Sequence, residues 1–408
     1  MRISFNYKYQ LNLNSILNAQ DRLQTASNKL EKQTKILTPS DDPAGSARVV
    51  AIDQQINQLS QYQGNSVLLK NNLDLEEQAF SNIRDSMDQV RTLVLSLGNG
   101  AYSQTDRSAI AIQIRNIQEH MYDLMNQRDA NGNYLFSGFQ ESQQTYVYNA
   151  VSGDYEFRGD EGQKFIQISQ SVTIASNDSA KYVFENVDRR FQTSTPTFSG
   201  GATAATATVT DQKQFDSFYK STYDPQTPAN NNFSLVVDAA NNYQILQNGA
   251  SMSPAVTGTY TSGSAINFNG LQLNVTGGVP SQVDFSLQAP EKTNVLNSLN
   301  RMINAVLTNS ASGDALSEVI KDTLSEVDSA SFYLDEAMSA IGGRQNVLEN
   351  ISQSIEDLQI ANKSYRADIY EIDYAEAITE LTKQETALQA VQQTFNRVNG
   401  TSLFDYIN

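Results

Sequence analysis

The chain of 408 residues has no cysteine, no tryptophan and a single histidine, His120. Without cysteine, disulfides, thiolate metal sites and thiol nucleophiles are excluded. One histidine cannot supply the pair that a helical zinc-protease motif needs. A Ser-His-Asp triad needs only one, but His120 lies in a helical pattern with no serine elbow nearby. We therefore expect no enzyme, no metal and no cofactor.

Long apolar runs are also missing. No segment approaches the roughly 20 apolar residues that a membrane-spanning helix needs. Residues 1–15 contain no continuous apolar stretch, so we expect no cleavable signal peptide. If the protein leaves the cell, it must use an export pathway that recognises a different signal.

Positive charge is scarce as well. The chain has 28 Lys and Arg residues against 45 Asp and Glu residues, and its net charge is -17. Such a balance repels phosphate backbones and anionic membrane surfaces, so nucleic acid and membrane partners are disfavoured. The simplest interpretation of this charge is solubility.

The first helical segment carries a narrow apolar stripe with a period of seven. Its members are Ile16, Leu23, Leu30 and Leu37. Ala19 and Ala26 lie three residues after the first two, as in a heptad pattern. A stripe this thin buries little apolar area within one chain. We therefore expect it to need a partner helix.

This helix is interrupted at residues 38–43, whose sequence is TPSDDP. Asp42 can cap a new helix, and Pro43 suits its first turn. The apolar steps that follow predict a long helix over 43–97, ended by Gly98-Asn99-Gly100. A third helix is expected to begin near Thr105.

The middle of the chain, about 139–289, has a different character. Short aromatic and β-branched runs recur there between glycine and asparagine clusters, which predicts strands. The Ala/Thr tract at 202–210 is compatible with a strand or a loop. Helical patterns resume at Glu291, and a last helix carries a second apolar stripe. That stripe includes Ile378, Leu381, Leu388, Val391 and Phe395.

The sequence thus predicts a mainly α protein with an inserted β domain. Because both ends are helical and flank the insertion, they must lie together. The expected architecture is a long antiparallel helical rod formed by the paired N- and C-terminal segments, with a β-rich outer domain between them.

Two local features allow more than one interpretation. Residues 129–133 (DANGN) faintly suggest a calcium loop, but positions six and twelve of such a loop hold Tyr134 and Gln140 here, so a turn is favoured. Gly342-Gly343 lies within a helical pattern. It indicates either a tolerated kink or a close helix approach or hinge.

Several motifs resemble the flagellin-like superfamily, and within it the proteins of the hook–filament junction rather than flagellin itself. They are residues 37–44 (LTPSDDPA), 131–138 (NGNYLFSG), 341–346 (IGGRQN), 373–381 (DYAEAITEL) and 402–407 (SLFDYI), together with the opening MRIS. The resemblance covers roughly the first 140 and last 120 residues. It implies an inner coiled-coil domain from 1–42 and 370–408, a helical rod domain from 43–139 and 290–369, and an outer β domain from 140–289.

The resemblance also implies a function and partners. The protein is expected to be a non-enzymatic subunit of the bacterial flagellum, exported through the flagellar type III channel and placed outside the cell at the hook–filament junction. Its implied partners are further copies of itself, hook-associated protein 1 on the hook side, flagellin on the filament side and a cytoplasmic export chaperone. Two alternatives remain open: a filament-forming flagellin, and a surface-binding module carried by the outer β domain.

The expected assembly interface follows the two terminal stripes and the apolar tail. It comprises Ile16, Leu23, Leu30, Leu37, Ile378, Leu381, Leu388, Val391, Phe395, Leu403 and Phe404. The export chaperone is expected to hold the last helix by its apolar face, at Leu388, Val391 and Phe395.

Overall fold

The fold was analysed in a computed structural model that describes residues 5–129 and 131–400. The chain divides into two compact units. The first consists of Met1–Asn71, Phe165–Ile174 and Gly343–Asn408, and the second of Asn72–Lys164 and Ala175–Gly342. Each unit therefore combines residues from both halves of the chain, as expected for helical ends that flank an insertion.

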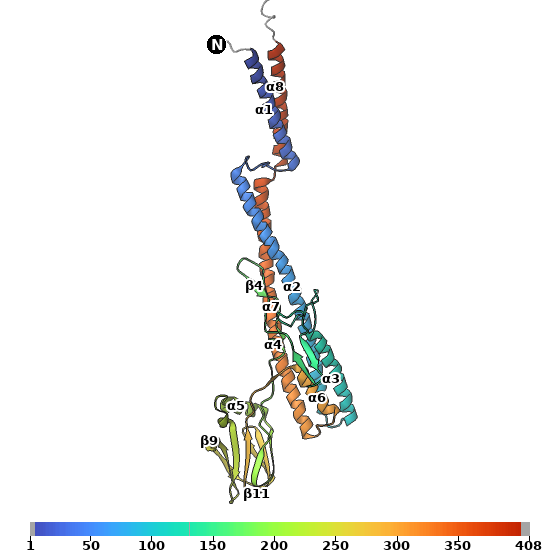
Figure 1. The fold of residues 1–408 in the computed structure, drawn as a ribbon, viewed down its shortest axis with the longest axis vertical. Helices are drawn as coiled ribbons and strands as arrows, with labels where there is room; N and C mark the ends of the chain where they lie inside the picture. Colours follow the sequence, from blue (N-terminus) through green and yellow to red (C-terminus); the bar gives the residue numbers. More distant parts are fainter. Residues whose placement is uncertain (1–4, 130, 401–408) are drawn as a thin grey trace, which may run out of the picture. The chain divides into compact units, whose positions relative to one another are not determined.

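The first unit contains a pair of helices from the two ends of the chain, α1 (Phe5–Lys32) and α8 (Tyr374–Gly400) (Figure 1). They run antiparallel, because Tyr9 meets Phe395 with ring centroids 5.6 Å apart while Gln33 and Ile372 are joined at the other end by a backbone hydrogen bond of 3.3 Å. The expected pairing of the terminal helices is confirmed.

Two longer helices, α2 (Pro43–Leu97) and α7 (Asp314–Tyr370), run through both units. Within the first unit, Arg366 Nε donates to Asp53 Oδ1 at 2.6 Å and Gln63 Nε2 donates to Ser352 Oγ at 3.1 Å. These contacts make the two helices antiparallel. The hairpin of β3 (Phe165–Gln167) and β4 (Thr173–Ala175) is held to α2 by Asn65, whose amide donates to Gln167 O at 2.7 Å.

The second unit adds α3 (Gln104–Met125) and α6 (Val295–Leu307) to its parts of α2 and α7. Helix α3 begins with a capping box in which Ser103 and Asp106 each accept a backbone N–H of the other. Apolar side chains of the four helices are fully buried. They include Phe80, Ile83, Met87, Val90 and Val94 of α2, Ile114 and Met121 of α3, Leu299 and Met302 of α6, and Val327 and Leu334 of α7.

Short β elements complete this helical core. They are the hairpin of β1 (Tyr146–Asn149) and β2 (Asp154–Phe157), the short helix α4 (Ala180–Val183), and the pair of β5 (Val187–Asp188) with β12 (Lys292–Thr293). Phe80 of α2 stacks on Phe136 at 5.2 Å and meets Phe184 edge-on at 5.8 Å. Segments that the strand pattern grouped with the outer domain therefore supply side chains to the core of the helical unit.

The remaining strands form one six-stranded antiparallel sheet. They are β6 (Thr197–Val209), β7 (Asn232–Val237), β8 (Asn242–Gln247), β9 (Ala250–Thr259), β10 (Ala265–Phe268) and β11 (Leu271–Ser286). Long β11 pairs with β6 on one side, and with β10 and then β7 on the other. Strands β7, β8 and β9 follow in order. The Ala/Thr tract is thus a strand, within β6.

This sheet has an apolar core of its own, closed by helix α5 (Gln212–Thr222) next to the short 3-10 turn η1 (Pro228–Asn231). Phe218 of α5 packs edge-on against Phe233 and Phe268, with ring centroids 5.6 and 5.1 Å apart. The chain is therefore mainly α, with long helices at both ends and a β-rich region between them, which is the fold class that the sequence predicts.

Candidate assembly interfaces

The terminal helix pair holds most of the expected interface residues. Ile16, Leu23 and Leu30 of α1 are half-buried, as are Leu381, Leu388, Val391 and Phe395 of α8. Fully buried positions on these two helices are the small residues Ala19 and Ala377. The two stripes therefore cover each other in part, and a substantial share of their apolar surface still faces water.

Two of the expected interface residues have other surroundings, and two lie outside the described part of the chain. Ile378 of α8 is 53% exposed. Leu37 is half-buried in the turn between α1 and α2. Leu403 and Phe404 lie outside the residues that the structure describes.

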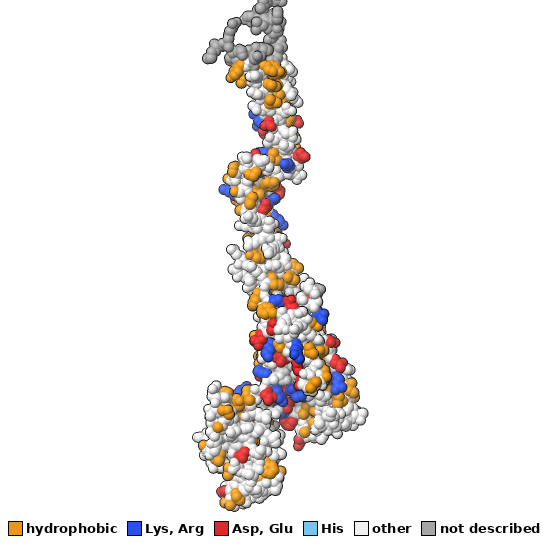
Figure 2. All heavy atoms as spheres, viewed as in Figure 1, with side chains coloured by type: hydrophobic (Ala, Val, Ile, Leu, Met, Phe, Trp, Pro, Cys, Tyr) orange, Lys and Arg blue, Asp and Glu red, His pale blue; other side chains and the backbone are white. Residues whose placement is uncertain are grey.

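The heptad pattern missed a further group of apolar side chains on α1. Leu11, Leu13 and Leu17 lie off the stripe, and Leu17 is 53% exposed. Figure 2 shows hydrophobic side chains gathered on this stretch of the helix pair. The signal in the sequence is the excess of leucine outside the seven-residue repeat, which a helix with one buried face does not need.

The two junctions between helices lie side by side in the first unit. Lys35 N donates to Tyr370 O at 2.8 Å, and Thr34 and Glu371 form an antiparallel bridge. The Lys35 ammonium donates to Asp368 O at 3.0 Å. The α1–α2 turn and the α7–α8 turn are therefore bonded to each other, which holds the ends of the two helix pairs in register.

The α1–α2 turn is ordered by two neighbouring aspartates. Asp41 Oδ2 accepts the backbone N–H groups of Leu37 and Thr38, both at 3.0 Å. The hydrogen bond from Thr38 and that from Leu37 lower the pKa of the Asp41 carboxyl. Asp42 Oδ1 accepts Gly45 N at 2.9 Å, so the expected cap of α2 is confirmed.

Gly45, which donates to the Asp42 cap, has little room for a side chain. A Cβ at this position would come within 2.2 Å of Asp42 Oδ2 and 3.0 Å of Ile36 Cδ1. Any larger residue would displace the capping carboxylate.

Asp129 and residues 131–133 are arranged as a turn rather than as an open cation loop. Asp129 Oδ1 accepts the N–H groups of Asn131 at 2.8 Å and Asn133 at 2.9 Å, and Gly132 has a φ of +87°. Burial alone would raise the pKa of Asp129, but these bonds lower it. The carboxylate is thus engaged by its own turn.

The glycine pair 342–343 continues the helix α7 without interruption. Among the described residues, nothing lies within 4 Å of where a Cβ of either glycine would sit. A close helix approach therefore does not explain these glycines, and the kink and the hinge stay open as predictions.

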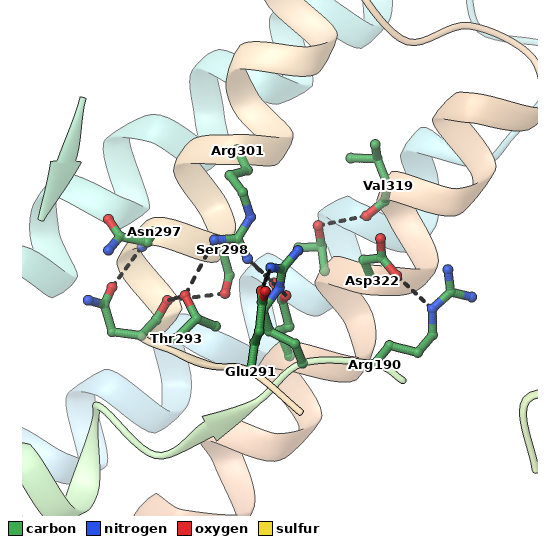
Figure 3. Close-up of polar contacts among 12 residues, drawn as sticks. Arg190, Glu291, Thr293, Asn297, Ser298, Arg301, Val319 and Asp322 are labelled. Atoms are coloured by element: carbon green, nitrogen blue, oxygen red, sulfur yellow. Dashed lines mark hydrogen bonds and ion pairs between the residues drawn. The ribbon is translucent and has the colours of Figure 1, made fainter. Parts of the chain in front are cut away.

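A cluster of ion pairs fixes the segment that leads from the helical core into the six-stranded sheet. Arg190 Nε donates to Asp322 Oδ1 of α7 at 2.6 Å (Figure 3). Its Nη2 donates to Glu318, one helical turn away on α7. The Arg190 side chain is only 6% exposed. Burial lowers the pKa of Arg190, but Glu318 and Asp322 raise it above its usual value.

The neighbouring Glu326 of α7 is the buried carboxylate of this cluster, with a side chain 2% exposed. Arg301 of α6 donates to both of its oxygens at 2.8 Å, and Arg189 donates to Oε1 at 3.3 Å. Arg189 also pairs with Glu291 on the returning segment. The outgoing segment is therefore tied to α7 by paired charges, and the returning segment is tied to the outgoing one. Sequence reasoning did not single out these residues, since the partners lie 25 positions apart for Arg301 and Glu326 and 137 apart for Arg189 and Glu326.

Within residues 5–129 and 131–400, no group of three or more His, Asp or Glu residues is arranged to hold a metal ion. The search of the described helices also found none with the length and hydropathy of a membrane span.

Comparison with known proteins places the chain in a class. Residues 3–141 match the bacterial flagellin N-terminal helical region, and residues 324–407 match the bacterial flagellin C-terminal helical region. Together the two regions include more than half of the chain and coincide with the paired helical ends. The chain belongs to the flagellin-like family.

Among its curated relatives is flagellar hook-associated protein 3 of Salmonella typhimurium, 25% identical over 187 residues, which are 46% of this chain and 58% of the relative. The Escherichia coli protein of the same name is 26% identical over 174 residues, 43% of this chain and 54% of the relative. The chain thus spans somewhat more than half the length of these relatives. The crystal structure of Xanthomonas campestris FlgL superimposes with a TM-score of 0.58 at 20% identity, covering 78% of this chain and 99% of that one, which shows a shared fold.

Proposed function

We propose that this protein is a structural subunit of the bacterial flagellum that forms the junction between hook and filament, and that filament attachment and motility depend on it. The observation that carries the proposal is the terminal helix pair, whose two apolar stripes remain half-buried within one chain. Further copies would complete the burial of these stripes in a layer of subunits. The matches to proteins named flagellar hook-associated protein 3 support the same reading.

The proposed partners follow from that role. They are neighbouring copies of this chain, hook-associated protein 1 on the hook side and flagellin on the filament side. A subunit between two different neighbours needs different contacts at its two axial ends, which is a heterologous arrangement. The proposed location is the flagellum outside the cell, reached through the flagellar type III channel, and the proposed role involves no catalysis.

Deletion of the gene tests the junction role directly. We expect cells with hooks but without filaments, and unpolymerised flagellin in the medium, by electron microscopy and immunoblotting of the supernatant. Cells that keep normal filaments after the deletion would contradict the proposal.

The terminal stripe is tested by the double substitution Leu23→Asp and Leu30→Asp. Charges placed against apolar neighbours cost about several kcal/mol per contact, so the exported protein should fail to join the hook. The matched control is Asn18→Asp with Thr25→Asp, which adds the same charge at the same spacing on the opposite, exposed face of α1. The control should swim normally. Normal swimming by the Leu23, Leu30 variant would remove the terminal stripe from the assembly contact.

The six-stranded sheet is proposed to contribute less to assembly than the terminal helices. Ser194 and Ser286 flank it and are hydrogen-bonded to each other at 2.8 and 2.9 Å. Excision of the residues between them with a short linker should therefore spare the helical core and leave partial motility. A wider excision from Glu141 would also remove the buried Tyr146 and Phe184. Complete loss of attachment after the narrow excision would assign the sheet a larger role.

The chaperone proposal concerns the apolar face of α8. Leu388, Val391 and Phe395 are half-buried against α1, so a groove that takes this helix would replace α1 as its partner. Serine at all three positions should abolish capture by the export chaperone in a pull-down. Unchanged capture would place the chaperone site elsewhere.

A flagellin that builds the filament itself is the second candidate, because the matched family regions are those of flagellin. The two candidates differ in self-assembly. Purified junction protein should not grow long filaments alone under conditions in which flagellin does, which electron microscopy of negatively stained samples would decide.

A further inference from the structure

Three strands of the six-stranded sheet have an open edge among the described residues: the long strands β6 and β9, and the four-residue β10, which pairs only with β11. Among the described residues, β6 has no strand partner besides β11, and β9 has none besides β8. Strand β6 is 13 residues long and β9 is 10 residues long. Each edge therefore presents a row of backbone N–H and C=O groups without a partner strand in the chain.

The two long edges, β6 and β9, lack the charged side chains that often protect an exposed strand. Soluble proteins place lysine or other charges on exposed edges, or shorten and twist them. Strands β6 and β9 contain no charged residue. The charges of this segment lie instead on α5, on the turns and at Asp284 of β11. Figure 2 shows few charged side chains on the visible face of the sheet region.

The accessible parts of the two edges are also free of interruptions. In β6, two register shifts, on either side of Gly277 in β11, separate the first residues from Ala204–Val209, which consists only of alanine, threonine and valine. In β9, Pro254 limits the edge to Ala255–Thr259. Thr206 of β6 and Thr257 of β9 are both exposed.

We propose that β6 of one copy pairs with β9 of the next copy, so that the outer sheets of neighbouring subunits join edge to edge. The partner is a second copy of this chain, because every copy carries both halves of the contact on opposite edges of one sheet. Such a contact is heterologous and can continue from copy to copy around a closed ring. Pairing of β6 with β6 would join only two copies and leave every β9 edge open.

Charge favours the same partner. Copies with a net charge of -17 repel one another over most of their surfaces. The two edges contribute nothing to that repulsion, and strand addition gains its affinity from backbone hydrogen bonds. The contact goes beyond the proposed function of the terminal helices and does not depend on it, since it needs only the folded sheet.

Cysteine pairs test the contact in the full-length protein, because the chain has no cysteine of its own. We would make Thr206→Cys with Thr257→Cys and treat the concentrated purified protein with a short bismaleimide, which tolerates a small error in register. The double variant should give a ladder of dimers, trimers and higher species on a denaturing gel, and each single variant should stay monomeric. Dimers from the single Thr206→Cys variant, a crosslink within one chain, or no crosslink would each overturn the proposal.

Lysines at the same edge positions give an independent check. The lysine variant carries Thr206→Lys and Thr257→Lys in a chain that also has Leu23→Asp and Leu30→Asp. These lysines should abolish self-association through the sheet, as measured by sedimentation. The matched control, Ala239→Lys with Ala240→Lys, adds the same charge in the exposed β7–β8 turn and should leave association unchanged. Equal association of the two lysine variants would overturn the pairing. The cysteine ladder should also persist when Leu23 and Leu30 are aspartate, which separates the sheet contact from a failure of the terminal helices.

Discussion

The terminal helix pair and the helical core of the second unit are built from similar sequence patterns, yet they are buried to different depths. In the second unit, Leu73, Ile83 and Val90 of α2 have no exposed surface. In the terminal pair, Leu23 and Leu30 are half-buried, and Leu17 is 53% exposed. Apolar residues repeated every seven positions, or at alternating steps of three and four, therefore predict a helix with an apolar face. The pattern does not show how much of that face is buried.

The difference arises from the number of elements that meet each stripe. In the second unit, α3, α6, α4 and the β1–β2 hairpin join α2 and α7 around one core. In the terminal pair, α1 and α8 have chiefly each other. The core of the second unit is buried within a single chain, and the terminal pair leaves part of its apolar surface exposed. Four measurements test how far the two regions differ.

The largest difference is expected in amide hydrogen exchange of the unassembled protein. Opening free energies range from about zero in frayed segments to the global value of about 5–15 kcal/mol in cores. Amides of 80–94 in α2 should exchange near the global limit, and amides of 20–30 in α1 should exchange many-fold faster. Mass spectrometry of pulse-labelled protein would measure both, and equal protection of the two segments would show that the terminal pair is already complete in the monomer.

Matched leucine deletions should separate the two regions next. Leu73→Ala removes a side chain with no exposed surface and should lower the free energy of unfolding by about 2–5 kcal/mol. Leu23→Ala removes a half-buried one and should cost roughly 1 kcal/mol or less in the monomer. Urea unfolding followed by circular dichroism tests this. If both substitutions lowered the free energy of unfolding equally, the stripe on α1 would be as well packed as the core.

The buried carboxylate of the second unit should matter more than an exposed one on α8. Glu326→Gln weakens the charged bonds from Arg301 and Arg189 and should cost about 1–3 kcal/mol. Glu380→Gln is the control, since Glu380 pairs with Lys383 on the open surface of α8 and should have no measurable effect. A stable Glu326 variant would show that the arginines find other acceptors.

The smallest effect is the pH dependence of the Arg190 cluster. Burial alone would raise the pKa of Glu318, but Arg190 and Lys321 lower it below its ordinary value of 4.5. Its ionisation therefore stabilises the fold above that pH, and this contribution is lost as the pH falls through the lowered pKa. Glu318→Gln should lower the free energy of unfolding by about 1 kcal/mol or less at pH 7. It should have no effect in acid, where Glu318 is protonated in both the folded and the unfolded chain.

Asp322 should show the opposite sign. Burial raises its pKa above 3.8 in spite of Arg190. A raised carboxyl pKa means that the folded state binds the proton more readily, so stability is gained as the pH falls through the raised pKa toward 3.8. Relative to the parent chain, Asp322→Asn should thus become less stable in acid, by less than about 1 kcal/mol. Parallel pH profiles for the two variants, from thermal unfolding, would contradict this assignment.

Much of the helical architecture was determined by the sequence alone. The repeat of Ile16, Leu23 and Leu30 predicted a helix in need of a partner. The break at Pro39 and Pro43 and the cap by Asp42 followed from local chemistry, because proline and the capping carboxylate act within a few residues. The order of helical ends around a β-rich middle predicted their pairing, since the two ends of an insertion must meet.

Only the tertiary structure decided which strands belong to which core. Tyr146 and Phe184 are as aromatic as Phe233, but the first two complete the helical core and the third the six-stranded sheet. Short apolar runs of this kind carry no information about their distant partners. The Arg190 cluster was hidden for the same reason, since Asp322 lies 132 positions away. The exposed fraction of each stripe depends on how many elements pack against it. The number of these elements is set by the fold as a whole.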